Sequence, residues 1–154
     1  MVARRLRDPA NPGGSKAIAR TGRLAQLSRP SLDHGLLVFA RDGRRFSRIV
    51  RRRLAAHHNH TILSSSSTGL FNPSVKGGRL AYVRSTRGRD RLMIRARRGH
   101  GSGHAIFSSR RRRGWIWSTA LTKRRVFFTI LRYHGAQPSA HIVSQRLRHQ
   151  RHHH

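Results

Sequence analysis

Histidine clusters are the side chains of this sequence whose types and spacing best fit a chemical site. His57, His58 and His60 lie within four residues of one another, and His100 and His104 form a second group. Imidazole is a good ligand for zinc, nickel and copper. The two groups could form a metal site if they occupy corresponding loops of adjacent structural units. The alternative is that both are solvated loops in a histidine-rich chain and bind no metal.

Catalytic groups are scarce. The only carboxylate side chains are Asp8, Asp33, Asp42 and Asp90, and cysteine is absent. General acid–base catalysis usually needs a positioned carboxylate or histidine, but the last three aspartates lie in predicted turns, where their side chains stabilise the backbone. The serine run at 64–67 lacks the flanking glycines of a serine nucleophile. We therefore expect a protein that is not an enzyme and uses no cofactor.

Arginine dominates the charge of the chain, which has 34 Lys plus Arg against four acids and a net charge of +30. Arginine makes bidentate contacts to phosphate and, beside aromatic rings, suits phosphate contact combined with base stacking. Nonspecific, salt-sensitive binding to polyanions is expected from this charge. The candidate nucleic-acid-binding residues are Arg51, Arg52, Arg53, Arg110, Arg111, Arg112, Arg113 and Trp115. In the alternative interpretation the arginines face water and Trp117 is a core residue, with the role of Trp115 left open.

The chain repeats itself. "RPSLDHGLLVFARDGRRFSRIVRRRL" (29–54) matches "NPSVKGGRLAYVRSTRGRDRLMIRAR" (72–97) without a gap, so that Pro30 falls on Pro73 and Phe39 on Tyr82. A weaker third copy covers 119–132. Apolar positions recur in register, whereas the long arginine runs differ between copies. The recurring feature is therefore the apolar pattern, which is what a repeated core requires.

Each copy has the pattern of short β-strands. Consecutive apolar positions such as "LMI" predict a sheet that is covered on both faces, and no helical periodicity is found. The predicted strands are 36–40, 80–84 and 126–131, then 48–50, 91–94 and 141–143, then 61–65 and 105–109, with the "NPSV"-type segment that opens the next unit as a fourth. Four short strands in roughly 43–46 residues is the spacing of a propeller blade. The prediction is an all-β, partial β-propeller of about three four-stranded blades.

The predicted organisation has three parts. Residues 1–16 form a basic, flexible N-terminal segment, and 149–154 form a histidine-rich, disordered tail. The segment between them, 17–148, holds the propeller-type repeats, with units near 28–70, 71–117 and 118–148. No stretch approaches the roughly 20 apolar residues that span a bilayer, and no signal peptide is visible.

Two segments carry a family resemblance. "FNPSVKGGRLAYVRS" (71–85) and "LSRPSLDHGLLVFARD" (27–42) resemble the blade signature of TolB-like propellers, which are related to WD-repeat proteins. That signature has a proline, a small residue, an apolar residue, an Asp-Gly type of turn and a strand that ends in an aromatic residue. The turn aspartate is kept only as Asp33, and the family closes rings of six or more blades. The resemblance, over roughly 17–148, implies a non-enzymatic scaffold for proteins or small ligands, often outside the cytoplasm.

A partial arc of blades leaves its two terminal sheet faces uncovered. Such faces predict self-association, for example as a dimer that completes a ring, or else the chain is part of a longer propeller. Two functions remain open on the sequence. The first is a protein-binding or structural scaffold, and the second is a basic nucleic-acid-binding protein, such as a ribosome-associated one.

Overall fold

The fold consists of three antiparallel sheets that follow one another along the chain. The computed structural model describes residues 25–55, 58–96 and 101–147. The first sheet contains β1 (Ala25–Leu27), β2 (Ser31–Asp33), β3 (Leu36–Gly43), β4 (Phe46–Arg53) and β5 (His60–Ser65). The middle sheet contains β6 (Gly69–Lys76), β7 (Arg79–Ser85), β8 (Arg89–Ala96) and β9 (His104–Arg110). A short 3-10 helix, η1 (Arg111–Arg113), leads to the last sheet, which contains β10 (Trp115–Leu121), β11 (Arg125–His134) and β12 (Gln137–Arg146).

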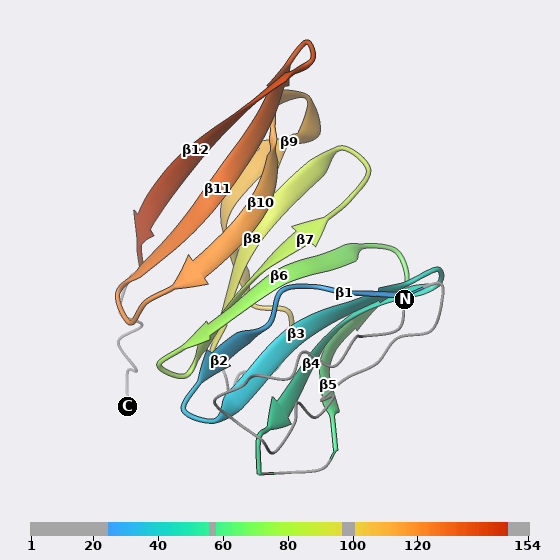
Figure 1. Ribbon diagram of the computed structural model, residues 1–154, viewed down its shortest axis with the longest axis vertical. Coiled ribbons are helices and arrows are strands. Elements are labelled where there is room, and N and C mark those ends of the chain that lie inside the picture. The colour runs from blue at the N-terminus through green and yellow to red at the C-terminus, as the bar shows by residue number, and fades with distance from the viewer. Residues whose placement is uncertain (1–24, 56–57, 97–100, 148–154) are drawn as a thin grey trace, which may run out of the picture.

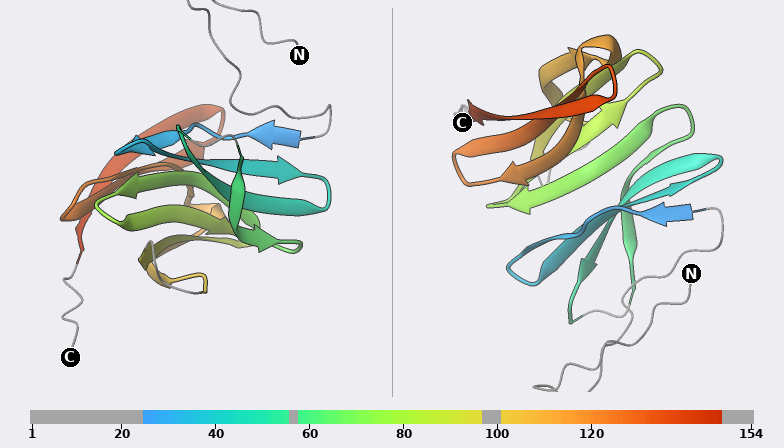
Figure 2. Two further views of the ribbon diagram at one scale, coloured as in Figure 1. Left: turned by 90° about the horizontal axis from the view of Figure 1, so that it is seen from below. Right: turned by 45° about the horizontal axis from the view of Figure 1, so that its top comes forward.

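The sheets are stacked in chain order, with the middle sheet between the other two (Figure 1). The right-hand view in Figure 2 shows the same order. The predicted all-β fold of about three blades is therefore confirmed. The described residues include no helix long and apolar enough to cross a membrane.

One strand assignment from the sequence is wrong. The "NPSV" segment lies in β6, which pairs with β7 of its own sheet and does not serve as the fourth strand of the preceding sheet. The reason is the tight turn at Gly77 and Gly78, whose φ values of 55° and 75° suit the two-residue hairpin that matches strand twist. His34 and Gly35 form the corresponding turn between β2 and β3, with φ values of 47° and 72°.

The first and middle sheets share a strand register. Leu27 of β1 pairs with Arg41, and Leu70 of β6 pairs with Arg84. Both residues of the second pair lie 43 positions after the corresponding residues of the first. The strands β1 and β2 together thus occupy the place of β6 in the middle sheet. The last sheet has three strands among the described residues, because no strand follows β12 there.

The hydrophobic core lies in two layers, one on each face of the middle sheet. On β7, Leu80 and Tyr82 pack toward the first sheet, whereas Ala81 and Val83 pack toward the last sheet. The "LMI" run of β8 behaves in the same way, since Met93 belongs to one layer and its two neighbours to the other. The prediction of a sheet covered on both faces is therefore correct for this strand.

Serine side chains tie the sheets together at corresponding places. Ser31 Oγ accepts a hydrogen bond from the Val75 N–H (3.0 Å), and Ser74 Oγ accepts one from the Leu121 N–H (2.9 Å). The first bond joins β2 to β6, and the second joins β6 to β10. In the last sheet the position that corresponds to Ser74 is Ala120, whose side chain cannot accept a hydrogen bond.

A second set of inter-sheet hydrogen bonds lies at the other end of the same strands. Ser47 Oγ accepts a hydrogen bond from the Leu70 N–H (2.8 Å), and Asp90 Oδ2 accepts one from the Ile116 N–H (3.1 Å). Ser47 and Asp90 are both buried and occupy the same place in their hairpins. By strand register the corresponding residue of the last sheet is Ala140, whose side chain, like that of Ala120, cannot accept a hydrogen bond.

Asp33 adds an ionic link between the first and middle sheets. Its carboxylate is buried and accepts hydrogen bonds from Lys76 Nζ (2.9 Å) and from the Gly77 N–H (2.9 Å). The bond from Lys76 is the main cause that holds the pKa of Asp33 below its ordinary value, although burial acts in the opposite direction. The aspartate of this turn therefore has a structural role, which is to hold the first sheet against the middle sheet.

The serine hydrogen bonds lead to a first prediction. Replacing Ser74 by alanine leaves the buried Leu121 N–H without a partner, so the free energy of unfolding should fall by about 1–3 kcal/mol. The matched control is Ala120→Ser, which occupies the corresponding place on the exposed side of the last sheet and should change stability by less than about 0.5 kcal/mol. Urea denaturation of both variants at one salt concentration measures the difference, and equal effects would contradict the assignment.

The Asp33 link predicts a pH dependence. Because the pKa is lower in the folded state, the stabilisation is present above the ordinary carboxyl pKa of 3.8 and is lost as the pH falls through the folded-state pKa. Asp33→Asn should therefore destabilise the protein at about pH 6, and the difference from the wild type should shrink as the pH falls progressively below 3.8. Denaturation midpoints of both proteins across this range test the prediction. A stability gap that does not shrink toward acid pH would show that the carboxylate charge is not responsible.

Candidate binding groove

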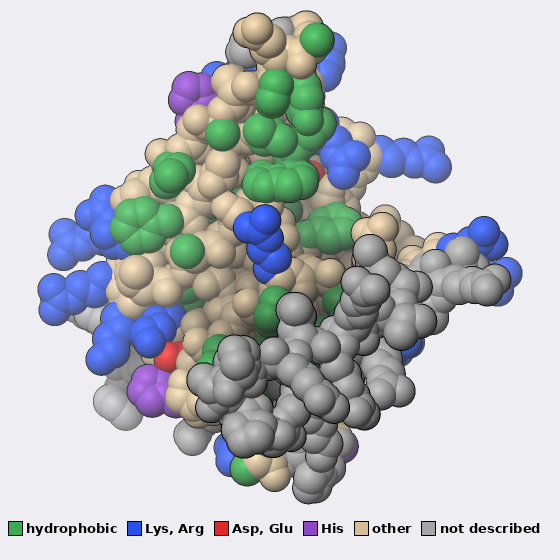
Figure 3. All heavy atoms as spheres, viewed as in Figure 1, with side chains coloured by type: hydrophobic (Ala, Val, Ile, Leu, Met, Phe, Trp, Pro, Cys, Tyr) green, Lys and Arg blue, Asp and Glu red, His purple; other side chains and the backbone are tan. Residues whose placement is uncertain are grey.

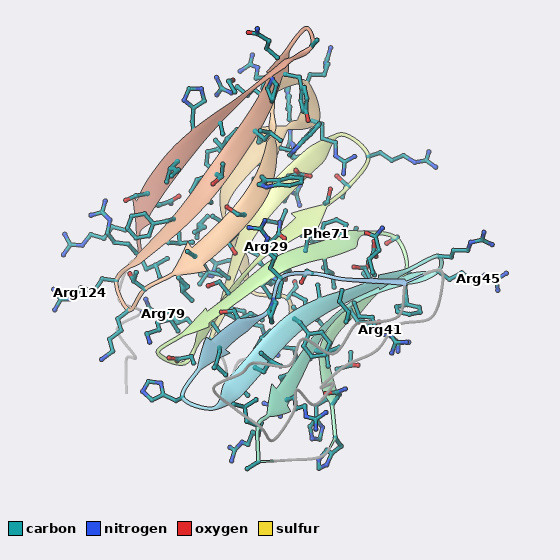
Figure 4. The ribbon with its side chains drawn as sticks, viewed as in Figure 1. Arg29, Arg41, Arg45, Phe71, Arg79 and Arg124 are labelled. Atoms are coloured by element: carbon teal, nitrogen blue, oxygen red, sulfur yellow. The ribbon has the colours of Figure 1, made fainter. Side chains whose placement is uncertain are left out.

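Residues from all three sheets line an open groove of about 670 Å³. Its walls come from the loop between β1 and β2 and from the middle parts of β6 and β10, together with Arg111, which precedes β10. In Figure 4 the labelled side chains of Arg29 and Phe71 lie near the centre of the face that is formed by these strands. The groove is therefore positioned by the stacking of the sheets rather than by a single loop.

Backbone irregularities shape the groove walls. The pairing of β6 with β7 shifts between Phe71 and Ser74, and the pairing of β10 with β11 shifts between Ile116 and Ser118. Within the first of these bulges, Asn72 has a φ of 47°, a conformation that asparagine adopts more readily than most residues. Bulges re-aim side chains out of the regular alternation of a strand. Residues at these positions therefore line the groove instead of entering the core.

Asn72 joins the two walls on either side of the groove. Its side-chain Nδ2 donates a hydrogen bond to the Trp117 carbonyl oxygen (2.6 Å), while its own carbonyl oxygen accepts one from Thr119 Oγ1 (2.5 Å). These two bonds fix β6 against β10 where neither strand pairs regularly. The backbone that carries Trp117 is thereby held in place, although the residue remains 55% exposed.

A buried carboxylate orients the arginine of the groove. Ser85 Oγ donates to Asp90 Oδ1 (2.6 Å) and accepts a hydrogen bond from Arg111 Nη2 (2.6 Å). Arg111 Nε also lies 3.6 Å from the Asp90 carboxylate, although about half of the Arg111 side chain is exposed. Arg111 is thus anchored on one side and open to the groove on the other. Such a held guanidinium is suited to an anionic group of a ligand.

Aromatic and cationic groups share this surface. Hydrophobic side chains gather over the middle of the face in Figure 3, with Lys and Arg among and around them and very little acidic surface. Trp115 is half-buried, and its ring lies 5.2 Å from that of Tyr133. The groove therefore offers stacking surfaces beside Arg29 and Arg111, which is a combination that binds anionic and planar or apolar groups together.

The structure brings only two of the predicted nucleic-acid-binding residues into the groove, namely Arg111 and Trp115. Arg51, Arg52 and Arg53 end β4, while Arg110 ends β9 and Arg112 and Arg113 belong to η1. None of these six lines the groove. Arg51, Arg52 and Arg53 belong to the first sheet, whereas Arg110, Arg112 and Arg113 flank Arg111 without lining the groove themselves.

The interpretation of Trp117 as a core residue is wrong. The residue is 55% exposed, because the bulge between Ile116 and Ser118 turns it away from the core that the buried Ile116 enters. Sequence reasoning also missed Arg29 and Asn72 as groove residues. Their place in the repeat could have indicated a shared role, since both residues directly precede the recurring prolines, Pro30 and Pro73.

The histidine clusters are placed in part. His58 and His60 are neighbours, with ring centroids 4.6 Å apart, and His104 is exposed at the start of β9. His57 and His100 lie outside the described residues. Within the described ranges, no group of three or more His, Cys, Asp or Glu residues could hold a metal ion. The five-histidine metal site as a whole stays a prediction.

Comparisons of the sequence with models of known protein families and with curated proteins give no match.

The two tryptophans allow the groove to be tested directly, because the chain has no others. In a Trp115→Phe variant the remaining Trp117 should be quenched strongly by acrylamide, since more than half of its side chain is exposed. In a Trp117→Phe variant the half-buried Trp115 should be quenched less and should emit at shorter wavelength. Equal quenching constants in the two variants would contradict the arrangement.

Proposed function

We propose that this protein is a non-enzymatic, TolB-like propeller scaffold that binds another protein. The observation that supports this proposal is the groove itself, where the exposed ring of Trp117 stands beside Arg29 and Arg111. Tryptophan and arginine are the residues that most often dominate the binding energy of protein interfaces. The stacked sheets bring together Arg29 from the loop between β1 and β2, Arg111 from η1 and Trp117 from β10. A rigid scaffold presents a binding surface in this way.

The blade-like construction supports the TolB-like part of the proposal. The first and middle sheets have the same order of hairpins, and each sheet binds the next through side-chain acceptors on corresponding strands. A ring or arc of blades needs such contacts, because each sheet must cover the face of its neighbour. Self-association through an uncovered blade face belongs to the same proposal.

A second candidate function is binding of nucleic acid, which Arg111 and Trp115 favour by their joint position in the groove. Arginine beside an aromatic ring can contact a phosphate and stack on a base. The net charge of +30 ensures attraction to any polyanion, so affinity alone does not separate the two functions. Dependence of folding on the polyanion does separate them.

The two functions predict different folding behaviour. A scaffold with two buried core layers should give a β-type circular dichroism spectrum and a cooperative melt at low ionic strength without any polyanion. A chain that depends on RNA should gain structure only when RNA is added. As a companion measurement, affinity for a labelled single-stranded oligonucleotide should fall steeply with salt if the binding is only electrostatic. A salt-resistant, sequence-selective complex would support the second function instead.

A further inference from the structure

Among the described residues, the last sheet has no counterpart of β5 and β9, which are the outer strands of the other two sheets. In the first sheet β5 pairs with the outer side of β4, and in the middle sheet β9 pairs with the outer side of β8. In the last sheet β12 takes the place of β4 and β8, and no described strand pairs with its outer edge. That edge consequently presents unpaired backbone N–H and C=O groups, which can pair with another polypeptide strand.

The strand register identifies the groups that face outward. The pairing of β11 with β12 runs without a shift from Arg125↔Arg146 to His134↔Gln137, and the Leu147 N–H donates to the Arg124 carbonyl (2.8 Å). Because inward and outward residues alternate along an antiparallel ladder, the backbone groups of Ala140, Ile142 and Ser144 point away from β11.

This edge carries few of the features that normally prevent strand addition. Short length, charged residues, prolines and bulges protect natural sheet edges. β12 is ten residues long and pairs without a bulge, whereas β5 and β9 have six and seven residues and pair through shifted registers. Pro138 lies near its start and Arg146 is its last residue, and between them Ile142 is 79% exposed.

Addition at the edge fits better than stacking of a further blade on the outer face. The inter-sheet hydrogen bonds of the other sheets need an acceptor at the positions of Ser74 and Asp90. The corresponding residues of the last sheet are Ala120 and Ala140, so a stacked blade of the same kind would leave two N–H groups without those acceptors. A strand added in the plane of the sheet needs neither of them.

Charge indicates the nature of the added strand. The segment 115–146 has five basic residues and no acidic one, and Arg146 lies on β12 itself. Arg125 Nε donates to Ser144 Oγ (2.8 Å), which places this guanidinium against β12. Residues 1–24 carry six basic residues against one acid, and a second copy of the chain has the same net charge of +30. Repulsion therefore disfavours both as occupants, whereas carboxylates would be attracted.

We propose that the outer edge of β12 binds an extended, acidic segment of a partner protein, which adds to the last sheet as its fourth strand. Backbone hydrogen bonds to Ala140, Ile142 and Ser144 would provide affinity, and carboxylates near Arg125 and Arg146 would provide selectivity for acidic sequences. This inference rests on the proposed function only in taking the partner to be a protein.

The test uses the full chain and a fluorescein-labelled peptide of alternating valine and glutamate, about ten residues long, to match β12. Ala140→Pro removes an outward N–H without removing a bond to β11, so it should weaken peptide binding by about tenfold or more at physiological salt. Ala140→Thr keeps the N–H and should bind like the wild type. Fluorescence anisotropy measures both, and the thermal melts of the two variants should be similar.

Two further measurements keep the proposal falsifiable if Ala140→Pro folds poorly. The same peptide with N-methyl groups on alternate residues has the same charge but cannot pair along its length, so it should bind much more weakly. In the wild type, amide exchange of Ile142 and Ser144 should be fast in the free chain and slow in the complex. Equal binding of the methylated peptide would mean that charge alone is responsible and would overturn the proposal.

Other occupants give distinct results, each of which contradicts the inference. Slow exchange of these amides in the free monomer would mean that a segment of the same chain already covers the edge. Slow exchange only at concentrations where sedimentation shows a dimer would identify a second copy. Loss of peptide binding in Trp117→Ala but not in Ala140→Pro would place the peptide in the groove, which leaves the proposed scaffold function standing.

Discussion

The burial of both faces of the middle sheet is the interaction on which the rest of the structure depends. Tyr82 and Leu92 are fully buried on opposite sides of it, one against the first sheet and the other against the last. A chain with a net charge of +30 repels itself, so the apolar layers must outweigh that repulsion. Two of the four carboxylates, Asp33 and Asp90, are buried where they join one sheet to the next.

The same stacking explains where binding chemistry can arise. Sheets that cover one another bring their first strands together, and the bulges in β6 and β10 release side chains from the core into the shared groove. The outer edge of the last sheet differs from the groove, because β12 pairs regularly with β11 and no other strand of the described residues pairs with β12. The groove thus depends on bulges in strand pairing, whereas the proposed edge site depends on backbone groups of β12 that face away from β11.

The strands were predictable because their apolar residues are clustered locally and recur at matching places. "LLVFA" begins β3 and "LAYVR" forms the centre of β7, and the consecutive apolar residues of "LMI" correctly indicated two covered faces. The groove was much less predictable. Arg111 and Trp115 were recognised by composition, while Arg29 and Asn72 were missed, and Trp117 was assigned to the core although its ring is exposed.

The sequence by itself determined the all-β class, the two-sided burial of the middle sheet and the charge, because each of these follows from local residue types and their order. Only the tertiary structure decided that the "NPSV" segment opens its own sheet, that Ser31 and Ser74 bind the following sheet, and which arginines meet the tryptophans. Those features depend on bulges and on contacts between residues more than 40 positions apart, and a single shift in register reverses which face a side chain occupies.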